Sequence, residues 1–368
     1  MPDLMVILEQ CLAPVPGGTA RYAREITAAL AAYRRPGWRV RSVTAWHRDV
    51  SAAGIPGVDG PHRLPVGRRP LSELWRHGWP PVVHGQSVHA TTPLAPPRRH
   101  RSVVTVHDAV PWTHPETLTA RGVAWHRAMV GRAMRVADAI VVPSRSVADD
   151  LSGIFPAAAG KITVIAHGVT AMPVPADAEQ RRRRLGLTDG YVLSVATLEP
   201  RKGLDVLVEA FASLSAGAPD LVLVGSPGWG GVDIATAASR AGLAQDRLHA
   251  LGHVGDTDLA AVMAGAGVLA APSRSEGFGL PVLEAMAAGI PVVCSDAPAL
   301  VELAAGVGLI VRREDAAALA AALEAVLADR SLADDLAARG RRRAGEFSWR
   351  RAAGQLWDLH AGSQGAAS

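Results

Sequence analysis

The sequence predicts an α/β protein built from two domains, each with a parallel sheet and helices on both faces. In both halves of the chain, short apolar runs typical of buried strands alternate with segments of helical spacing, and this alternation favours parallel sheets. A proline-bearing polar stretch at residues 171–177 separates the two alternations and indicates a linker. The length of 368 residues is enough for two separate cores. We therefore expect an N-terminal domain over residues 1–170 and a C-terminal domain over residues 171–348.

The N-terminal half is expected to open with a strand at residues 4–8, a turn at Gly17 and Gly18, and a helix over residues 20–30. Residues 51–81 are rich in glycine, proline and arginine. They are expected to form mostly loop, with one short helix near residues 71–77. The remaining strands of this half are expected at residues 39–45, 82–84, 87–90, 101–108, 139–144 and 161–168, and its other helices at 122–136 and 146–151.

The C-terminal half shows the same alternation and ends in a series of helices. Its strands are expected at residues 191–196, 220–225, 248–253, 267–272 and 291–295. Its helices are expected at residues 180–185, 203–214, 232–241, 259–264, 281–288, 315–327, 332–345 and 349–360.

The charge balance argues against nucleic-acid binding. The formal net charge is +4, and the basic residues are almost all arginine, with Lys161 and Lys202 the only lysines. The basic residues are not interleaved with aromatic ones, and no nucleic-acid recognition motif is present. The arginine-rich segments at residues 34–35, 68–69 and 98–101 could make a weak peripheral contact with anionic lipid, which we rank below a solvated surface.

Neither a membrane span nor a secretion signal is expected. No apolar run reaches 18 residues, and the N-terminus lacks a basic segment before an apolar one. We expect a cytoplasmic protein, with the inner face of the membrane as a secondary location. Cys11 and Cys294 lie in different halves and fit no metal or disulfide pattern, so we expect both to be small core residues.

The stretch Ser275–Glu284 predicts an anion site flanked by carboxylates. It connects an apolar strand to a helix that opens with Pro281 and closes on Gly289. The start of such a helix offers unpaired backbone N–H groups and a positive dipole end to a phosphate. Glu276 in the loop and Glu284 in the helix can accept hydrogen bonds from vicinal sugar hydroxyls. The combination suggests a nucleotide-sugar site.

Lys202 is the second feature that points to a phosphate. It lies in the segment Leu198–Gly203, which follows a strand and opens a helix. A lysine near a helix start is unfavourable for the helix dipole, and this chain hardly uses lysine. The alternative is a charged surface turn. We favour the interpretation that Lys202 binds a phosphate group.

Further candidates fall at the carboxyl ends of predicted strands. These are His107, the segment from Thr197 to Lys202, Gly225, His253 and Glu276. Because ligands of parallel sheets bind at that edge, they are expected to meet in one cleft. His107 either contacts the reacting sugar or is a satisfied structural histidine. Gly17 and Gly18 either admit a ligand phosphate or form a tight turn.

The sequence Asp256-Thr-Asp258 is similar to the metal-binding DxD of another transferase class. It precedes a helix, where aspartate is a good cap. We expect a helix cap and assign no metal.

Taken together, these motifs resemble the retaining glycosyltransferases of family 4, which have the two-domain GT-B fold. Glu276 and Glu284 match the E-x7-E pair of that family. The resemblance thins over residues 45–85 and otherwise spans nearly the whole chain. The other matching segments are Pro-x-Gly17-Gly18, Val106–Asp108, Val142–Ser144, His167–Val169 and Thr197–Gly203. It implies two Rossmann-like domains facing a central cleft, with the last helix, near residues 349–362, crossing back to the N-terminal domain.

The resemblance also implies a role for each residue. Glu284 would hold the nucleotide ribose, and Glu276 with the backbone of Gly277 and Phe278 would hold the transferred sugar. Lys202 and Arg201 would bind the diphosphate, and His107 would lie beside the anomeric carbon. Backbone at Gly18 and at Gly279–Leu280 would support the diphosphate, while Gly17, Thr197, Gly225, His253 and Val254 would line the rest of the donor site. Ala196-Thr197 stands where many members carry an arginine, which leaves more of the charge neutralisation to Arg201 and Lys202.

The implied reaction is retaining, metal-independent transfer of a hexose to a hydroxyl of a glycan or lipid-linked acceptor. The Leu-Glu-Pro-Arg-Lys sequence is most similar to the mannosyltransferase-like branch, so GDP-mannose is the favoured donor, with no cofactor besides this substrate. UDP- or dTDP-sugar donors, a nucleotide-sugar 2-epimerase and a catalytically silent binding protein remain alternatives. A dehydrogenase is disfavoured, because no G-x-G-x-x-G follows the first strand. The oligomeric state is not predicted.

Overall fold

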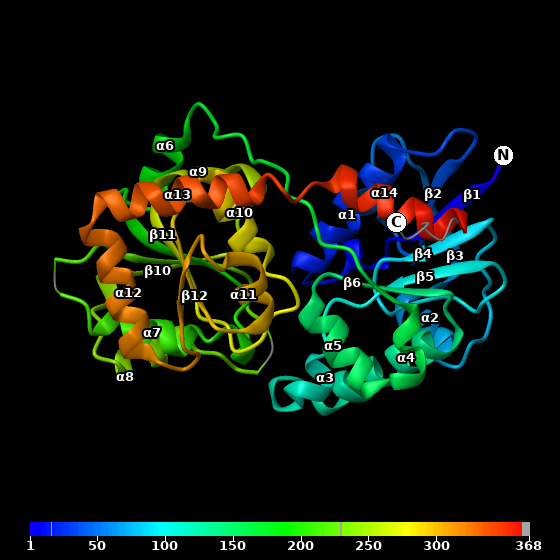
Figure 1. Cartoon of the computed structure of the whole chain (residues 1–368), viewed down its shortest axis with the longest axis horizontal. Coiled ribbons are helices and arrows are strands. Elements are labelled where there is room, and N and C mark those ends of the chain that lie inside the picture. The colour runs from blue at the N-terminus through cyan, green and yellow to red at the C-terminus, as the bar shows by residue number, and fades with distance from the viewer. Residues whose placement is uncertain (16, 216, 229, 363–368) are drawn as a thin grey trace. The chain divides into compact units, whose positions relative to one another are not determined.

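The structure is a computed structural model and describes residues 1–15, 17–215, 217–228 and 230–362. The chain divides into two compact units (Figure 1). The first unit contains residues 1–115 and 120–168 and the C-terminal segment from residue 348, and the second contains residues 116–119 and 169–347. In the described residues no helix is long and apolar enough to cross a membrane.

The first unit is built on a seven-stranded sheet in the order β3-β2-β1-β4-β5-β6-β7. Every neighbouring pair in it is parallel. Its strands are β1 (Asp3–Ile7), β2 (Arg39–Trp46), β3 (Asp59–Gly67), β4 (Ser87–Ala90), β5 (Arg101–Thr105), β6 (Ala139–Val142) and β7 (Ile162–Val164). Its helices are α1 (Gly17–Ala32), α2 (Arg68–Arg76), α3 (Val110–Thr113), α4 (Ala120–Val136), α5 (Arg145–Ile154) and α14 (Trp349–Ala361).

Helices cover both faces of this sheet (Figure 1). The last helix, α14, packs with α1 in one core cluster, where Trp357 and Leu356 meet Ile26 and Leu30. The indole N–H of Trp357 donates to the carbonyl of Leu30 at 3.2 Å. The C-terminal helix therefore belongs to the first unit, as the resemblance implied. Cys11 is buried in the same cluster, and Cys294 is buried in the second unit, which confirms their expected role.

Two expectations for residues 51–84 are wrong. Residues 59–67 form the edge strand β3, where the sequence predicted loop. Prolines are tolerated at a sheet edge because a strand there has unpaired N–H positions, and the mostly exposed side chains of β3 hide the apolar alternation of a strand. Residues 82–84 are not a strand. Val83 is apolar because it fills the core from a loop.

A group of buried histidines lies in the first unit. His89 of β4 is fully buried, and neither of its ring nitrogens has a hydrogen-bond partner in the described part of the chain. The ring of His360, on α14, lies 5.2 Å from it between centroids. Burial, together with the nearby His107, lowers the pKa of His89 to about 3. The folded protein therefore keeps His89 neutral at physiological pH.

Acid is expected to destabilise the first unit. Between pH 6.5 and about 3, the unfolded chain binds a proton at His89 that the folded chain excludes, so the free energy of unfolding falls as the pH falls. The slope for one such proton is about 1.4 kcal/mol per pH unit. Urea unfolding at pH 7 and pH 5 can be followed by tryptophan fluorescence, because eight of the nine tryptophans lie in this unit. We expect His89→Leu to reduce the slope and His100→Leu, at an exposed position, to leave it unchanged. Equal slopes in the wild type and His89→Leu would contradict this assignment.

The second unit is built on a six-stranded parallel sheet in the order β10-β9-β8-β11-β12-β13. Its strands are β8 (Tyr191–Val195), β9 (Leu221–Val224), β10 (Leu248–Gly252), β11 (Ala266–Ala271), β12 (Val292–Ser295) and β13 (Leu309–Val311). Its helices are α6 (Ala178–Arg184), α7 (Leu204–Ala212), α8 (Ile234–Arg240), α9 (Asp256–Gly265), α10 (Leu280–Ala288), α11 (Pro298–Ala304), α12 (Ala316–Ala328) and α13 (Arg330–Ala344). Neither α11 nor β13 was predicted from the sequence.

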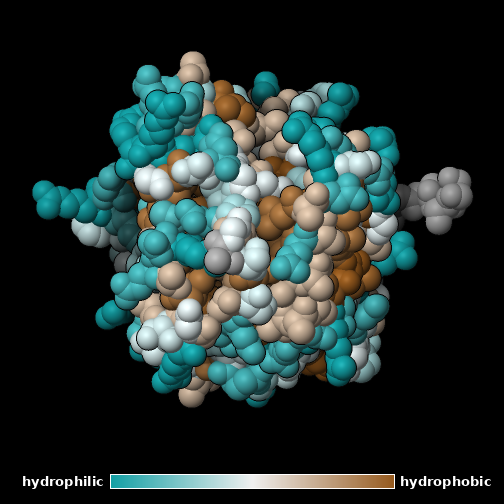
Figure 2. All heavy atoms as spheres, turned by 90° about the vertical axis from the view of Figure 1, so that its left-hand side faces the viewer, coloured by the Kyte–Doolittle hydropathy of each residue, from teal (hydrophilic) through white to brown (hydrophobic). Residues whose placement is uncertain are grey.

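Helices also cover both faces of the second sheet. Residues of α7 and α12 pack in one core cluster with Val192, Leu223 and Val268 of the sheet, and α10 lies on the other face (Figure 1). On the side of the molecule where α12 lies, hydrophobic residues are exposed in groups between projecting hydrophilic side chains (Figure 2). Exposed apolar area of this kind is ordinary for a folded protein. Both units thus have the doubly wound architecture that the sequence predicted.

Candidate active site

The strand order of the second sheet defines where a ligand can bind. From β8 the chain adds β9 and β10 on one side, and from β11 it adds β12 and β13 on the other. The loops that leave the carboxyl ends of β8 and β11 therefore diverge, and open sheets bind ligands at such a switch point. A small hollow lies there, lined by Ser194, Val195, Ala196, Lys202, Leu269, Ala270, Ala271, Pro272, Ser273, Glu276, Gly279, Pro281 and Val282.

The loop after β8 places Lys202. It ends in a short 3-10 turn, Pro200–Lys202, after which Gly203 adopts a left-handed conformation with φ 63° and caps α7. A Cβ atom on Gly203 would lie 2.2 Å from the carbonyl oxygen of Pro272. Only glycine fits this close approach. The loop after β8 is thus held directly against the loop after β11.

An ion pair joins these two loops. Lys202 Nζ lies 2.5 Å from Glu276 Oε1, although 74 residues separate them in the sequence. Their side chains are only 11% and 12% exposed. Arg201 Nη1 lies 3.5 Å from the other Glu276 oxygen, and Ser273 Oγ donates to Oε1 at 2.8 Å. The structure therefore brings together Arg201, Lys202 and Glu276, which the sequence predicted from separate motifs.

The electrostatics of the cluster keep Glu276 ionised. Burial on its own would raise the pKa of Glu276, but the charges of Lys202 and Arg201 outweigh it and lower that pKa below its usual value. Burial and the neighbouring Arg201 lower the pKa of Lys202. Arg201 also pairs with Glu199 at 2.9 Å. Glu276 is thus a carboxylate at neutral pH and can accept hydrogen bonds from hydroxyl groups.

Arg274 stabilises both loops and was not predicted from the sequence. Its guanidinium forms a bidentate pair with Asp205 at 2.9 and 2.8 Å and contacts Glu314 at 2.9 Å. It also donates to the carbonyl of Pro200 at 2.6 Å. In the sequence Arg274 is only an arginine at the end of a buried strand, and this position does not indicate which residues it pairs with. Ser273, which follows the same strand, was also missed, whereas Glu199 lies inside the predicted segment Thr197 to Lys202.

The loop after β11 leads into the start of α10. Gly279 caps the helix with φ 101°, and a Cβ atom there would lie 2.6 Å from Leu300. Gly277, Phe278 and Leu280 are buried around it. The Phe278 ring packs edge-on against Phe347 at 5.9 Å, so its backbone rather than its side chain is the part that can meet a ligand. Glu284 lies on α10 and is largely buried.

The remaining predicted residues of the second unit follow neighbouring strands. Thr197 follows β8, and Gly225 follows β9. A Cβ atom on Gly225 would lie 1.9 Å from the carbonyl oxygen of Ala196, so this glycine has a packing role. His253, which is exposed, and Val254, which is partly buried, follow the edge strand β10.

Three predicted residues lie in the first unit, at the carboxyl edge of its own sheet. Gly17 and Gly18 are exposed at the start of α1, and Gly17 has φ 60°. His107 follows β5, and its Nε2–H donates to the carbonyl of Thr91 at 2.8 Å. This leaves Nδ1 as the acceptor nitrogen of the ring. Burial lowers the pKa of His107, which favours the neutral ring.

Comparisons with known proteins identify the family. Residues 16–171 match the model described as Glycosyltransferase Family 4, and residues 176–343 match the model described as Glycosyl transferases group 1. The O-antigen chain mannosyltransferase B of Escherichia coli is 31% identical over 275 residues, which cover 73% of this chain and 71% of that protein. This protein belongs to glycosyltransferase family 4.

Two further similarities agree with this assignment. The D-inositol 3-phosphate glycosyltransferase of Salinispora arenicola is 34% identical over 61% of this chain, and the match spans about half of that protein, 54%. The crystal structure of HepE from Anabaena, solved with UDP-glucose, has a TM-score of 0.75 at 20% identity and covers 98% of this chain and 100% of that one. The fold of this family 4 glycosyltransferase is thus GT-B, with two Rossmann-like units.

The prediction that an aspartate of the Asp256–Asp258 stretch is the N-cap of the helix is wrong. The N-cap of α9 is Gly255, and Asp256 and Asp258 lie in the first turn. Asp258 instead pairs with Arg181 at 2.6 Å. Both carboxylates still complement the helix dipole. Among the described residues of the glycosyltransferase, no group of three or more His, Cys, Asp or Glu side chains could hold a metal ion.

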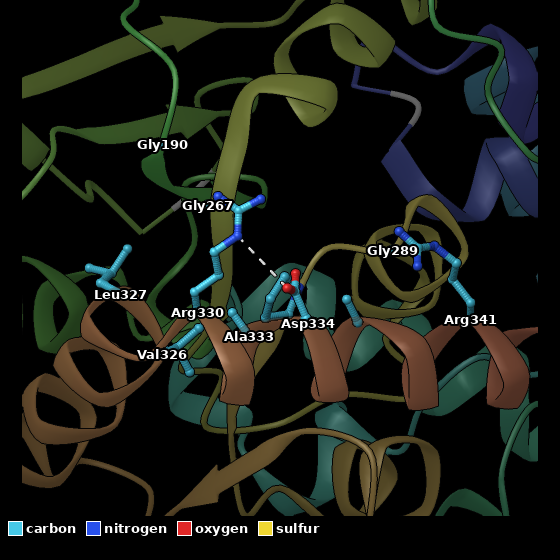
Figure 3. A pocket seen from close by; sticks show the side chains of 11 residues that line it. Gly190, Gly267, Gly289, Val326, Leu327, Arg330, Ala333, Asp334 and Arg341 are labelled. Carbon is cyan, nitrogen blue, oxygen red and sulfur yellow. Dashed lines mark ion pairs between the residues drawn. The ribbon is translucent and has the colours of Figure 1, made fainter.

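A second hollow, the amino-edge hollow, lies at the opposite edge of the second sheet (Figure 3). It is lined by Gly190, Gly267 and Pro291, which precede or begin strands, and by side chains of α12 and α13. Arg330 extends toward Asp334, its ion-pair partner at 3.8 Å. Since ligands of parallel sheets bind at the carboxyl ends, this hollow is not the candidate donor site.

Proposed function

We propose that the protein transfers a hexose, mannose from GDP-mannose, to a hydroxyl group of a glycan or glycolipid. The observation that supports this most strongly is the meeting of Lys202, Arg201 and Glu276 at the switch point of the second sheet. The choice of mannose is supported by the Leu198–Lys202 motif and by the name of the similar mannosyltransferase from Escherichia coli.

Each residue of the cluster has a distinct proposed role. Lys202 and Arg201 bind the diphosphate, helped by backbone N–H groups at Gly279–Leu280. Glu276 accepts hydrogen bonds from the transferred sugar, a role that the lowered pKa of its carboxyl favours. Glu284 binds the ribose. His107 acts beside the anomeric carbon, and its acceptor nitrogen suits a sugar hydroxyl.

We further propose that the reaction retains the anomeric configuration and needs no metal. The bond between the anomeric carbon and the diphosphate oxygen breaks, the acceptor oxygen bonds to the same face of that carbon, and the acceptor's hydroxyl proton passes to the departing diphosphate oxygen. Lys202 and Arg201 stabilise the negative charge on the leaving diphosphate. Both glutamates have binding roles in this scheme, so neither acts as a covalent nucleophile. We propose a cytoplasmic enzyme with at most weak contact with the inner membrane face.

Donor choice and reaction class can be tested together. In a thermal-shift panel of GDP-, UDP-, ADP- and dTDP-sugars, GDP-mannose is expected to give the largest rise in melting temperature. A larger rise with UDP-glucose, the ligand of HepE, or with a dTDP-sugar would change the donor and leave the class intact. NMR of the product should show net transfer with retained configuration, undiminished by EDTA. Inversion at C2 of free donor would instead indicate a 2-epimerase.

A further inference from the structure

Two tryptophans of the first unit are 58% exposed, Trp46 and Trp79. They lie at opposite edges of the sheet. Trp46 is the last residue of β2, at the carboxyl edge where parallel sheets bind ligands. Trp79 lies in the segment between α2 and the start of β4, at the amino edge. An indole ring exposed at the ligand edge is a candidate contact for a substrate.

Trp46 is next to a polar cluster formed by the loops after β1, β2 and β3. Glu9 is almost fully buried, and one of its oxygens accepts the backbone N–H of Ala45 at 2.8 Å. Its other oxygen lies 2.8 Å from His47 Nε2 and 3.8 Å from Arg68 Nε. Gly67 is the register partner of Trp46, so the backbone of Arg68, at the start of α2, follows a residue that lies next to Trp46 in the sheet.

Arg68 has an unused hydrogen-bond donor in this cluster. Its Nη1 is buried and has no partner among the residues that the structure describes. Leaving such a donor unpaired is costly, and a turn of the guanidinium that exposed it to an oxygen atom of a ligand would satisfy it. The side chains of Arg68 and His47 are 37% and 22% exposed, so each keeps part of its surface open to a ligand at this edge of the sheet. The site thus combines a flat apolar ring with polar groups at its rim.

We propose that Trp46 is the stacking platform for a pyranose ring of the acceptor glycan, with Arg68 and His47 as partners of its hydroxyls. The C–H face of a pyranose packs against an aromatic ring, while its hydroxyl groups need polar partners around the edge. This inference rests on the proposed function for the identity of the acceptor. A membrane anchor fits less well, because it needs an apolar face, whereas the groups beside Trp46 are polar or charged.

The position of Trp46 also indicates the length of the acceptor. The strands β2 and β5 are three places apart in the sheet, which corresponds to about 14 Å at about 4.8 Å per strand. His107, the proposed neighbour of the anomeric carbon, follows β5. A sugar on Trp46 is therefore separate from the one that receives the hexose, and the platform holds a more distant residue of an oligosaccharide.

A glycan array with bacterial and mannose oligosaccharides of one to five residues tests this inference. The wild type is expected to bind glycans of three or more residues, and Trp46→Ala should weaken that binding about tenfold. Trp46→Phe, which keeps an aromatic ring, should weaken glycan binding less than Trp46→Ala does. The matched control Trp79→Ala should bind like the wild type. Failure of the wild type to bind any glycan, or equal binding by the wild type and Trp46→Ala, would overturn the proposal.

Two companion measurements separate this inference from its alternatives. Thermal shift with GDP-mannose should be the same for Trp46→Ala and the wild type, because the donor cluster lies in the other unit. Absence of binding to every nucleotide sugar of the panel, together with Trp46-dependent glycan binding, would refute the proposed function and leave the platform standing. If Trp46→Ala instead loses binding to vesicles of phosphatidylglycerol while its glycan binding is unchanged, Trp46 is a membrane contact and the proposal fails.

Discussion

Replacing Lys202 with alanine is expected to lower kcat/KM by about 10²–10³-fold, the range found when one preorganised charge-stabilising group is removed. A cation about 4 Å from a phosphate oxygen contributes about 4 kcal/mol at an effective dielectric constant of 20. A neutral hydrogen bond contributes only about 0.5–1.5 kcal/mol. The Lys202 side chain is 11% exposed, so solvent screens this charge only weakly. Its removal should therefore cost more than the loss of any single hydroxyl contact.

Steady-state kinetics with the donor, combined with calorimetric titration of GDP, measure this effect. The control is Lys161→Ala, which removes the only other lysine of the chain. Lys161 contacts backbone carbonyls of Arg135 and Ala137 in the first unit, and its loss should leave kinetics unchanged. Lys202→Arg should recover part of the activity, because it keeps the charge. Turnover close to normal in Lys202→Ala would refute the diphosphate role.

Gly225→Ala is expected to destabilise the second unit by about 3 kcal/mol, the upper end of the usual cost of overpacking. The added Cβ atom would lie 1.9 Å from the carbonyl oxygen of Ala196. A backbone atom cannot rotate away as a side chain can, so the loop after β8 must shift. The same loop contains Lys202, and donor affinity should therefore fall with stability.

Circular dichroism melting and donor thermal shift together measure both consequences. Gly217→Ala is the matched control in the same unit, because nothing lies within 4 Å of a Cβ atom there. An unchanged melting temperature in Gly225→Ala would show that the loop accommodates the methyl group. A lower melting temperature with full donor affinity would show that Gly225 is needed for packing and does not set the position of the loop after β8.

The sequence was sufficient to predict most strands and helices because both halves follow a regular βα alternation. It could not predict that β3 is a strand, since Pro61 and Pro65 interrupt the pattern of this exposed edge. It also assigned residues 82–84 to a strand, because a core valine in a loop has the same apolar signature. Local patterns report burial, and only the assembled sheet decides whether a buried residue belongs to a strand.

The candidate site was predictable in its parts but not in its assembly. Lys202 and Glu276 were each placed at the carboxyl end of a strand, where the structure has them. That they form an ion pair depends on β8 and β11 being neighbours, which no local pattern encodes. Arg274 was missed because its partners come from two stretches distant from it in the sequence, residues 200–205 with Pro200 and Asp205, and Glu314.

We propose that the diphosphate of a nucleotide sugar binds at the switch point of the second sheet. A crystal structure of the protein with GDP-mannose tests it most directly. We expect a phosphate oxygen within about 3.2 Å of Lys202 Nζ. Glu276 should accept hydrogen bonds from the sugar hydroxyls, and Glu284 should accept them from the ribose. A donor bound away from Lys202, for example in the amino-edge hollow, would show that Lys202 does not bind the diphosphate.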